Sequence, residues 1–175
     1  MKQLTTILLT ALSSFFIFSC GDQVESNFEY ETKIGINQFD ADSIEAAIET
    51  FTKIIDENDT CAECLRYRAF AYKGLKKYDK ALEDQNSFIQ LDTAEPVGYA
   101  NRASIYYMKK DYVKALADFQ KALALNPENT SMYNPISHML FATGQEDRAC
   151  EYYQKAIAIG DTTFDIKIID YCNRK

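Results

Sequence analysis

A 34-residue spacing recurs through most of this chain and limits its fold more than any other feature of the sequence. Small residues occupy two columns at this spacing. The first column holds Gly35, Ala69, Ala103 and Ser137, and the second holds Ala47, Ala81, Ala115 and Ala149. A third column is mostly aromatic, with Phe51, Gln85, Phe119 and Tyr153. A period of this length indicates stacked structural repeats, because a single unit of this size cannot bury its own apolar face.

Each unit has the pattern of two helices joined by a turn. In residues 96–129, Tyr99, Ala103 and Tyr106 lie at helical spacing, and the polar run 109–111 ends their apolar stripe. A second stripe follows and stops before Pro127, because proline disfavours helical geometry in the residue before it. The small columns allow two antiparallel helices to approach closely. The sequence therefore predicts an all-α fold.

At these positions the chain resembles the tetratricopeptide repeat (TPR) family. The residues of the third unit that match the family pattern are Tyr99, Ala103, Tyr106, Tyr112, Ala115, Phe119, Ala122 and Pro127. The resemblance implies a right-handed α–α superhelix of about four repeats over residues 28–163, in units 28–61, 62–95, 96–129 and 130–163.

Three departures from the regular unit are expected. Unit 28–61 is degenerate, and its first helix is predicted to be short, over 34–39. The first helix of unit 130–163 is predicted to start late, with Pro135 in its first turn. Residues 164–175 are predicted to form a final amphipathic helix that caps the array.

The N-terminus has the pattern of an export signal. Residues 4–18 carry no charge, and a run of about 15 residues suits a signal peptide better than a membrane span of about 20. The run ends at residues 17–20, Ile-Phe-Ser-Cys, which resemble the lipobox of bacterial lipoproteins except at the bulky Phe18. The resemblance implies a signal peptide over 1–19, a lipid on Cys20, a tether over 20–27 and anchoring in the bacterial cell envelope, at the outer membrane and facing the periplasm or the surface. A plain secretory signal and an uncleaved membrane helix are the alternatives.

An exported chain meets oxidising conditions, which favour disulfides among the other four cysteines. Cys150 and Cys172 each lie 11 residues from Asp161, the expected turn between two antiparallel helices, so we expect them to face each other and form a disulfide. A free buried thiol is the alternative for Cys150.

Cys61 and Cys64 form a Cys-x-x-Cys motif. We expect a local disulfide at the start of a helix, with Thr60 and Glu63 as a capping box. A thiol–disulfide oxidoreductase is the less favoured alternative, because a helix N-terminus stabilises the thiolate.

Composition excludes several classes of function. The chain has 26 acidic and 19 basic residues, a net charge of −7, which argues against nucleic acid or an anionic lipid surface as its main partner. Carboxylates such as Glu83, Asp84 and Glu128 are expected to lie in solvent. With a single histidine, His138, and no phosphate-binding or nucleophile motif, we predict no metal, no cofactor, no catalytic residue and no enzymatic activity.

The resemblance implies a protein-interaction scaffold whose concave groove is lined by the first helix of each unit. The expected groove residues are Arg66, Phe70, Lys73, Asn101, Ser104, Tyr107, Met108, Asn134, His138 and Phe141. Their mixed aromatic, polar and basic character suits a peptide or a partner helix, unless they pack against one another. An envelope assembly complex is an alternative setting for the same scaffold.

One TPR subclass binds a chaperone C-terminal carboxylate through a clamp of basic residues and asparagines. Arg66 and Asn101 fall on two positions of that clamp. Phe70, Ser131 and Pro135 occupy the others, where amide or basic side chains are needed, so membership of that subclass is not predicted.

Overall fold

The computed structural model describes residues 20–174, with side chains from residue 27 onward. Within residues 20–174 the chain forms nine α-helices and one short 3-10 turn, with no strand, so the predicted all-α fold is confirmed. The expected signal peptide, residues 1–19, and the side chain of Cys20 lie outside the described part. No helix between residues 20 and 174 combines the length and apolar character that a membrane span requires.

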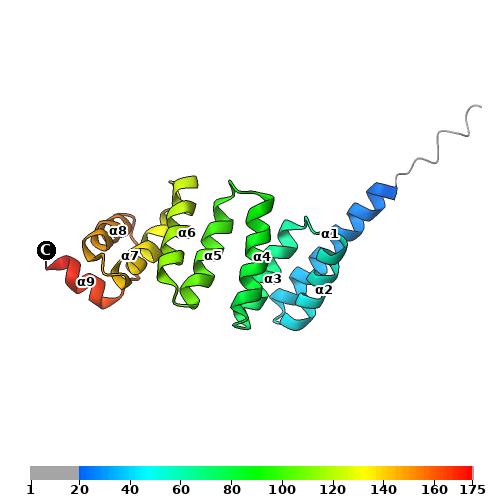
Figure 1. Cartoon of the computed structure of the whole chain (residues 1–175), viewed down its shortest axis with the longest axis horizontal. Helices are drawn as coiled ribbons and strands as arrows, with labels where there is room; N and C mark the ends of the chain where they lie inside the picture. The colour runs from blue at the N-terminus through cyan, green and yellow to red at the C-terminus, as the bar shows by residue number, and fades with distance from the viewer. Residues whose placement is uncertain (1–19, 175) are drawn as a thin grey trace, which may run out of the picture.

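Eight of the helices form four antiparallel hairpins, which stack side by side into an elongated array (Figure 1). In chain order the hairpins pair α1 (Cys20–Asp40) with α2 (Ile44–Glu57), α3 (Ala62–Gly74) with α4 (Tyr78–Leu91), α5 (Pro96–Met108) with α6 (Tyr112–Leu125), and α7 (Tyr133–Ala142) with α8 (Glu146–Ala158). Each second helix also contacts the first helix of the next hairpin. The 3-10 turn η1 (Thr130–Met132) precedes α7, and α9 (Ile166–Asn173) packs on α8 at the C-terminal end.

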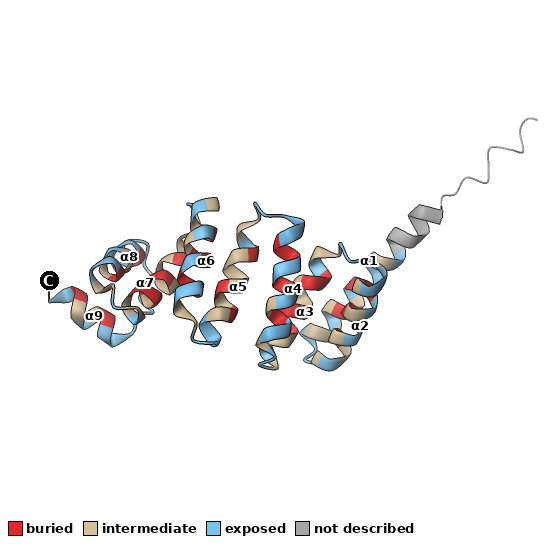
Figure 2. Cartoon of the chain, in the orientation of Figure 1, coloured by how far each residue is buried: buried red, intermediate tan, exposed pale blue. Residues whose placement is uncertain are grey.

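The repeated columns of the sequence are the lines along which the helices meet. Every residue of the two small columns is buried, and all four alanines of the second column are fully buried. Figure 2 shows buried segments along the helix–helix contacts and exposed segments at the turns. In the first unit the approach is so close that a Cβ on Gly35 would lie 2.6 Å from Cε1 of Phe51. Close backbone approach at small residues therefore sets the spacing of the hairpins.

The first helix differs from the sequence-based expectation. A short helix over 34–39 and a tether over 20–27 were expected, whereas α1 is one helix of 21 residues that begins at Cys20. Its inner stripe runs through Phe28, Thr32, Gly35 and Phe39, at intervals of four, three and four residues. Thr32 is buried, and its hydroxyl donates to the carbonyl oxygen of Phe28 at 2.8 Å. Because the hydroxyl of Thr32 forms its hydrogen bond within α1, this threonine can be buried, and it extends the inner stripe of the helix.

The fourth unit and the C-terminal helix follow the predictions. Pro135 is the third residue of α7. The 34-residue spacing from the starts of α3 and α5 would place the start of α7 at residue 130, but η1 occupies 130–132 and α7 starts three residues later. In α9, Ile168 and Cys172 are buried against Tyr153 and Phe164, and the charged residues of the helix face solvent. The structure joins Cys172 to Cys150 of α8 by a disulfide with a Cα–Cα distance of 5.4 Å.

Two buried ion pairs hold the central hairpins together, and one of them corrects the expectation for Asp84. Asp84 is only 5% exposed and accepts two hydrogen bonds from Arg68, so it does not lie in solvent. The same arrangement recurs 34 residues later, between Arg102 and Asp118. The sequence pattern alone did not predict these ion pairs. An aspartate that faces solvent and an aspartate that faces an arginine of the neighbouring helix occupy similar positions on a helix, so the pattern does not distinguish them.

The turn inside each hairpin contains one residue with a left-handed backbone. The four equivalent positions, spaced by 34 residues, are Asp42, Lys76, Lys110 and Gly144, with φ values of 59°, 59°, 63° and 75°. Only glycine adopts this conformation without a steric penalty, since a Cβ there costs about 1–2 kcal/mol. Three of the four turns therefore carry local strain.

Candidate partner-binding face

The first helices of the hairpins, α3, α5 and α7, present the side chains that were expected to line a groove. A cavity of about 230 Å³ opens between α5 and α7. It is lined by Ser104, Tyr107, Phe119, Asn134, Pro135, His138 and Met139. Four of these residues were among the ten predicted for the groove, and we refer to this cavity as the α5–α7 pocket.

The α5–α7 pocket combines an apolar floor with polar groups. Met139 and Phe119 are buried, whereas Tyr107 is 43% exposed and stands at the opening, with its ring 5.8 Å from that of Tyr112. Sequence reasoning did not include Phe119 and Met139, which belong to the core pattern, or Pro135, which was assigned to a helix start and to an unfilled clamp position. The sequence pattern does not distinguish a buried residue that borders a cavity from a buried residue of the core.

On α3 the expected groove residues stack on one another. The guanidinium of Arg66 lies 4.6 Å from the ring centre of Tyr67, and the ring of Phe70 meets that of Tyr67 edge-on at 6.3 Å. The ammonium of Lys73 lies 5.2 Å from the ring centre of Phe70. Aromatic and cation–π contacts of this kind order long side chains, so α3 presents an organised basic surface.

Two nitrogen donors between α3 and α5 lack an anionic partner. Lys73 donates to the hydroxyl of Ser104 at 3.4 Å, and among the described residues no carboxylate pairs with it. Burial lowers the pKa of Lys73, because removing the ammonium from water disfavours its charged form. The buried Nδ2 of Asn101 has no hydrogen-bond partner in the described residues. Lys73 is therefore suited to an acceptor oxygen brought by a partner, whereas the Nδ2 of Asn101 is closed off from solvent.

Two of the expected groove residues have structural roles. The side-chain nitrogen of Asn134 donates to Thr163 and Asp161 and so ties the start of α7 to the loop before α9. The ring of Phe141 packs edge-on against Tyr171 of α9 at 5.9 Å. Met108, at the end of α5, is 51% exposed and lies outside the residues that line the pocket. The structure therefore concentrates the open face around Ser104, Tyr107 and His138.

Hydrogen-bond donors around Asp161 shift its ionisation. The backbone N–H and the hydroxyl of Thr163 donate to this carboxylate, and Asn134 adds a third, longer hydrogen bond. These donors stabilise the charged form and lower the pKa of Asp161. These hydrogen bonds tie the loop before α9 to Asn134, which also lines the α5–α7 pocket.

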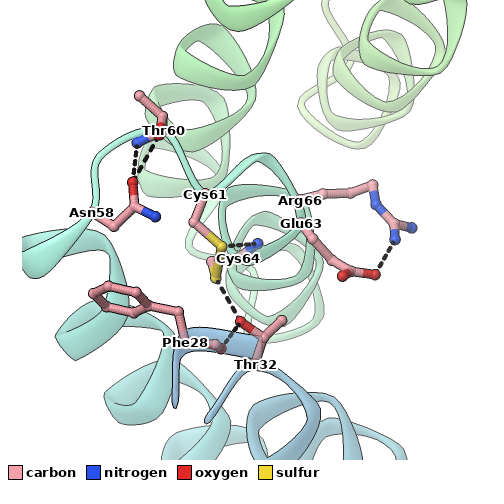
Figure 3. The surroundings of a disulfide bond; sticks show 8 residues. All are labelled: Phe28, Thr32, Asn58, Thr60, Cys61, Glu63, Cys64 and Arg66. Carbon is pink, nitrogen blue, oxygen red and sulfur yellow. Dashed lines mark hydrogen bonds and ion pairs between the residues drawn. A yellow bond between two sulfur atoms is a disulfide. The ribbon is translucent and has the colours of Figure 1, made fainter. Parts of the chain in front are cut away.

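Cys61 and Cys64 lie at the start of α3 and form a disulfide with a Cα–Cα distance of 5.3 Å (Figure 3). Cys64 is fully buried, and its Sγ lies 3.5 Å from the hydroxyl of Thr32 on α1. Cys61 is the N-cap residue, because its Sγ accepts from the backbone N–H of Cys64 at 3.3 Å.

The expected capping box at this helix start is wrong. The hydroxyl of Thr60 donates to Asn58 at 2.7 Å, and Glu63 pairs with Arg66 at 3.4 Å, as Figure 3 shows. With Cys61 as the cap residue, Thr60 lies one position too early to reach the N–H groups of the first turn.

Among residues 20–174, no group of three or more histidine, cysteine, aspartate and glutamate side chains is placed to hold a metal ion.

The third and fourth helical hairpins match known family models. Family models described as "Tetratricopeptide repeat" match residues 96–129 and 130–159. The chain is 29% identical over 104 residues to the small glutamine-rich tetratricopeptide repeat-containing protein 2 of Mycosarcoma maydis and 27% identical over 120 residues to that of Saccharomyces cerevisiae. The matches cover 59% and 68% of this chain, but only 30% and 35% of those relatives. The chain therefore spans about a third of the length of these curated relatives.

Solved structures share the architecture. A crystal structure of the MamA protein superposes with a TM-score of 0.70 at 24% identity, covering 75% of this chain and 72% of MamA. MamA from Desulfovibrio magneticus RS-1, residues 41 to the end, superposes with a TM-score of 0.71 at 17% identity, covering 79% and 78%. The first TPR of Spaghetti (RPAP3), solved with an HSP90 peptide bound, has a TM-score of 0.64 at 24% identity and covers 67% and 93%. At these identities the likeness establishes the fold.

Proposed function

Because this chain contains a tetratricopeptide repeat array, we propose that it is a lipid-anchored scaffold of the bacterial cell envelope that binds a protein or peptide through its first-helix face. The α5–α7 pocket is the observation that carries the binding part of this proposal. Its volume of about 230 Å³ is below the range of about 300–1,000 Å³ that is usual for sites that enclose a small molecule. A pocket of this size on an open helical face suits one side chain of a bound polypeptide.

The chemistry around the pocket defines what the partner should bring. Tyr107, Phe119 and Met139 supply apolar contact for one anchoring side chain. Beside them, the ammonium of Lys73, which contacts the pocket residue Ser104, is a donor without an anionic partner among the described residues. A polypeptide offers both kinds of group at once, an apolar side chain and backbone or side-chain oxygens. The peptide held by the first TPR of Spaghetti supports a peptide as the class of partner.

Site-specific photo-crosslinking tests the face. A photoreactive phenylalanine analogue at Tyr107, which is half-exposed at the pocket opening, should trap a defined partner in cells. The same analogue at Lys121, exposed on the second helix α6, is the matched control. Adding Ser104→Trp to the Tyr107 probe should abolish the crosslink, because the indole fills the pocket. Identical products from both positions, or a crosslink that persists with Ser104→Trp, would refute binding at this face.

The lipid anchor is supported by the lipobox resemblance that ends at Cys20 and is tested separately. Labelled palmitate should enter the chain and be lost in Cys20→Ala, while a Cys61→Ala variant keeps the label. Label that remains on the Cys20→Ala chain would rule out the anchor and leave the binding face unaffected. If the scaffold belongs to an envelope assembly complex, the same crosslinked partner should co-purify with it as part of a large stable assembly.

We propose no enzymatic role. The packing of Cys64 supports a structural function for the Cys61–Cys64 disulfide, because its Sγ lies 3.5 Å from the hydroxyl of Thr32 and so holds the start of α3 against α1. Insulin reduction is the direct test: turnover by the intact chain that disappears in Cys61→Ser would replace the structural assignment with a catalytic one.

A further inference from the structure

One edge of the array carries a cluster of lysines, although the chain as a whole has a negative net charge. The turns inside the second and third hairpins lie side by side along the edge opposite to the start of α1 (Figure 1). Six exposed lysines belong to these two turns and the helix ends beside them: Lys76, Lys77, Lys80, Lys109, Lys110 and Lys114. We call them the lysine edge.

Most of this charge is not neutralised. Lys109 pairs with Asp79, and Lys114 pairs with Asp111 at 2.8 Å. Among the described residues, the remaining four lysines have no carboxylate partner. Acidic residues lie at the corresponding places of the outer hairpins: Asp42 in the turn of the first, and Glu146 and Asp147 at the start of α8 in the fourth. The uncompensated positive charge is therefore confined to the middle of the edge.

Lys76 and Lys110 occupy positions where glycine would be more stable. They are equivalent residues of successive units, and both have a left-handed backbone, with φ values of 59° and 63°. The equivalent residue of the fourth unit is Gly144. Strain at such positions costs stability and is often associated with function, so the paired lysines need an explanation beyond folding.

Apolar side chains lie beside the same turn and connect it to the pocket. Met108 is 51% exposed and Val113 is 71% exposed, at the two ends of the α5–α6 turn. Tyr107, 43% exposed, belongs to this group and also lines the α5–α7 pocket. Exposed apolar side chains are therefore present both at the pocket and beside the lysine edge.

We propose that the lysine edge binds an acidic polypeptide segment that also carries apolar side chains. Carboxylates of the segment pair with Lys76, Lys77 and Lys110, and its apolar side chains cover Met108 and Val113. Acidic groups on the neighbouring turns repel the same segment and so restrict it to the central part of the edge. The choice of a polypeptide over an anionic lipid surface rests on the proposed anchor at Cys20, because the edge points away from the end of α1 that the anchor would hold at the membrane.

A fluorescein-labelled peptide of repeated Glu-Glu-Leu triplets is the probe, with a Lys-Lys-Leu peptide as its charge-reversed control. The full chain should bind the acidic peptide and not the basic one, and added salt should weaken binding. The Lys76→Gly/Lys110→Gly variant should bind roughly fivefold more weakly, since two exposed ion pairs are lost. This variant relieves backbone strain, so unfolding cannot account for weaker binding.

Two matched variants separate charge from backbone. Lys76→Arg/Lys110→Arg keeps the charge and the strain and should bind like the parent chain. Asp42→Gly relieves the equivalent strain without removing a cation and should also retain binding. Failure of the parent chain to bind the acidic peptide, or unchanged binding by Lys76→Gly/Lys110→Gly, would overturn the proposal.

A lipid outcome is also distinguishable. If the parent chain prefers phosphatidylglycerol vesicles to phosphatidylcholine vesicles, and Lys76→Gly/Lys110→Gly loses that preference, the edge is a lipid-binding surface and the polypeptide assignment is wrong. Crosslinking at Tyr107 tests the pocket independently, so failure of the lysine edge and failure of the proposed partner-binding face give different results.

Discussion

Arg68 and Asp84 form a two-point ion pair across the α3–α4 hairpin. Nε and Nη2 of Arg68 donate to the two carboxylate oxygens at 2.9 and 2.7 Å, and Nη1 donates to Thr52 of α2 at 3.0 Å. One repeat later, Arg102 pairs with Asp118 in the same way, and its third hydrogen bond goes to Asn86 of the preceding hairpin at 2.8 Å. Each arginine therefore joins three helices from two successive units.

Removing one partner of this pair should destabilise the fold strongly. Asp84→Ala leaves the guanidinium of Arg68, whose side chain is 14% exposed, without its carboxylate, and we expect a loss of about 3 kcal/mol in the free energy of unfolding. Asp79→Ala is the matched control, because its carboxylate is 85% exposed and should contribute less than about 1 kcal/mol. Urea unfolding followed by circular dichroism measures both. Equal losses would show that burial does not strengthen the Arg68 pair.

Gln85 should be replaceable with a gain in stability. Its side chain is fully buried, and neither its Nε2 nor its Oε1 has a hydrogen-bond partner in the described residues, while the other units place Phe51, Phe119 and Tyr153 at the equivalent position. Gln85→Met keeps the volume and removes both unsatisfied groups, so we expect stabilisation of about 1–2 kcal/mol. Gln90→Met, on the exposed face of the same helix, should change little. Destabilisation by Gln85→Met would indicate that buried water satisfies the amide.

Relief of the left-handed turns should also stabilise the chain. Lys76→Gly and Lys110→Gly should each raise the free energy of unfolding by about 1 kcal/mol, because glycine adopts positive φ without a steric penalty. The reverse change, Gly144→Ala, should lower it by a similar amount, since its φ is 75°. Thermal unfolding of the three variants provides the comparison. A lysine variant that melts below the parent chain would contradict the assigned strain.

The Cys150–Cys172 disulfide should hold α9 on the array. It closes a loop of 22 residues, and Cys150→Ser/Cys172→Ser should cost about 3 kcal/mol on the loop-entropy model. Cys61→Ser/Cys64→Ser opens a separation of only three residues and should cost much less. Hydrogen exchange should show faster exchange throughout α9 in the first variant alone. Unchanged protection of α9 would mean that packing around the buried Ile168 is sufficient without the bond.

The helical hairpins could be predicted because the same pattern of small residues recurs in each of the four repeats, although the pattern in any one repeat is weak evidence. One buried alanine indicates little, but Ala47, Ala81, Ala115 and Ala149 at constant spacing indicate a contact that recurs, and all four are fully buried. The first helix was predicted too short because charged residues separate Phe28 from Thr32 and Gly35. Only contact with α2 and α3 shows that these residues form one inner stripe.

The candidate face was predicted less completely, for a related reason. Ser104, Tyr107, Asn134 and His138 were expected on this face because first helices line it, and they do border the pocket. Phe119 and Met139 complete the pocket from positions that the pattern assigns to the core. Phe141 contacts Tyr171 of α9, which lies beyond its repeat unit, and Asn134 contacts Thr163 at the far end of its own unit.

The sequence by itself determined the repeat period, the helical hairpins and the positions of close approach, because these depend on residue size and spacing within one unit. Tertiary structure alone decided which charges are buried and which are exposed. Asp84 and Glu83 are neighbours in the sequence, yet only Asp84 faces an arginine of the adjacent helix. Likewise, a net charge of −7 gave no sign of the lysine edge, because charges far apart along the chain are brought together only when successive turns stack side by side.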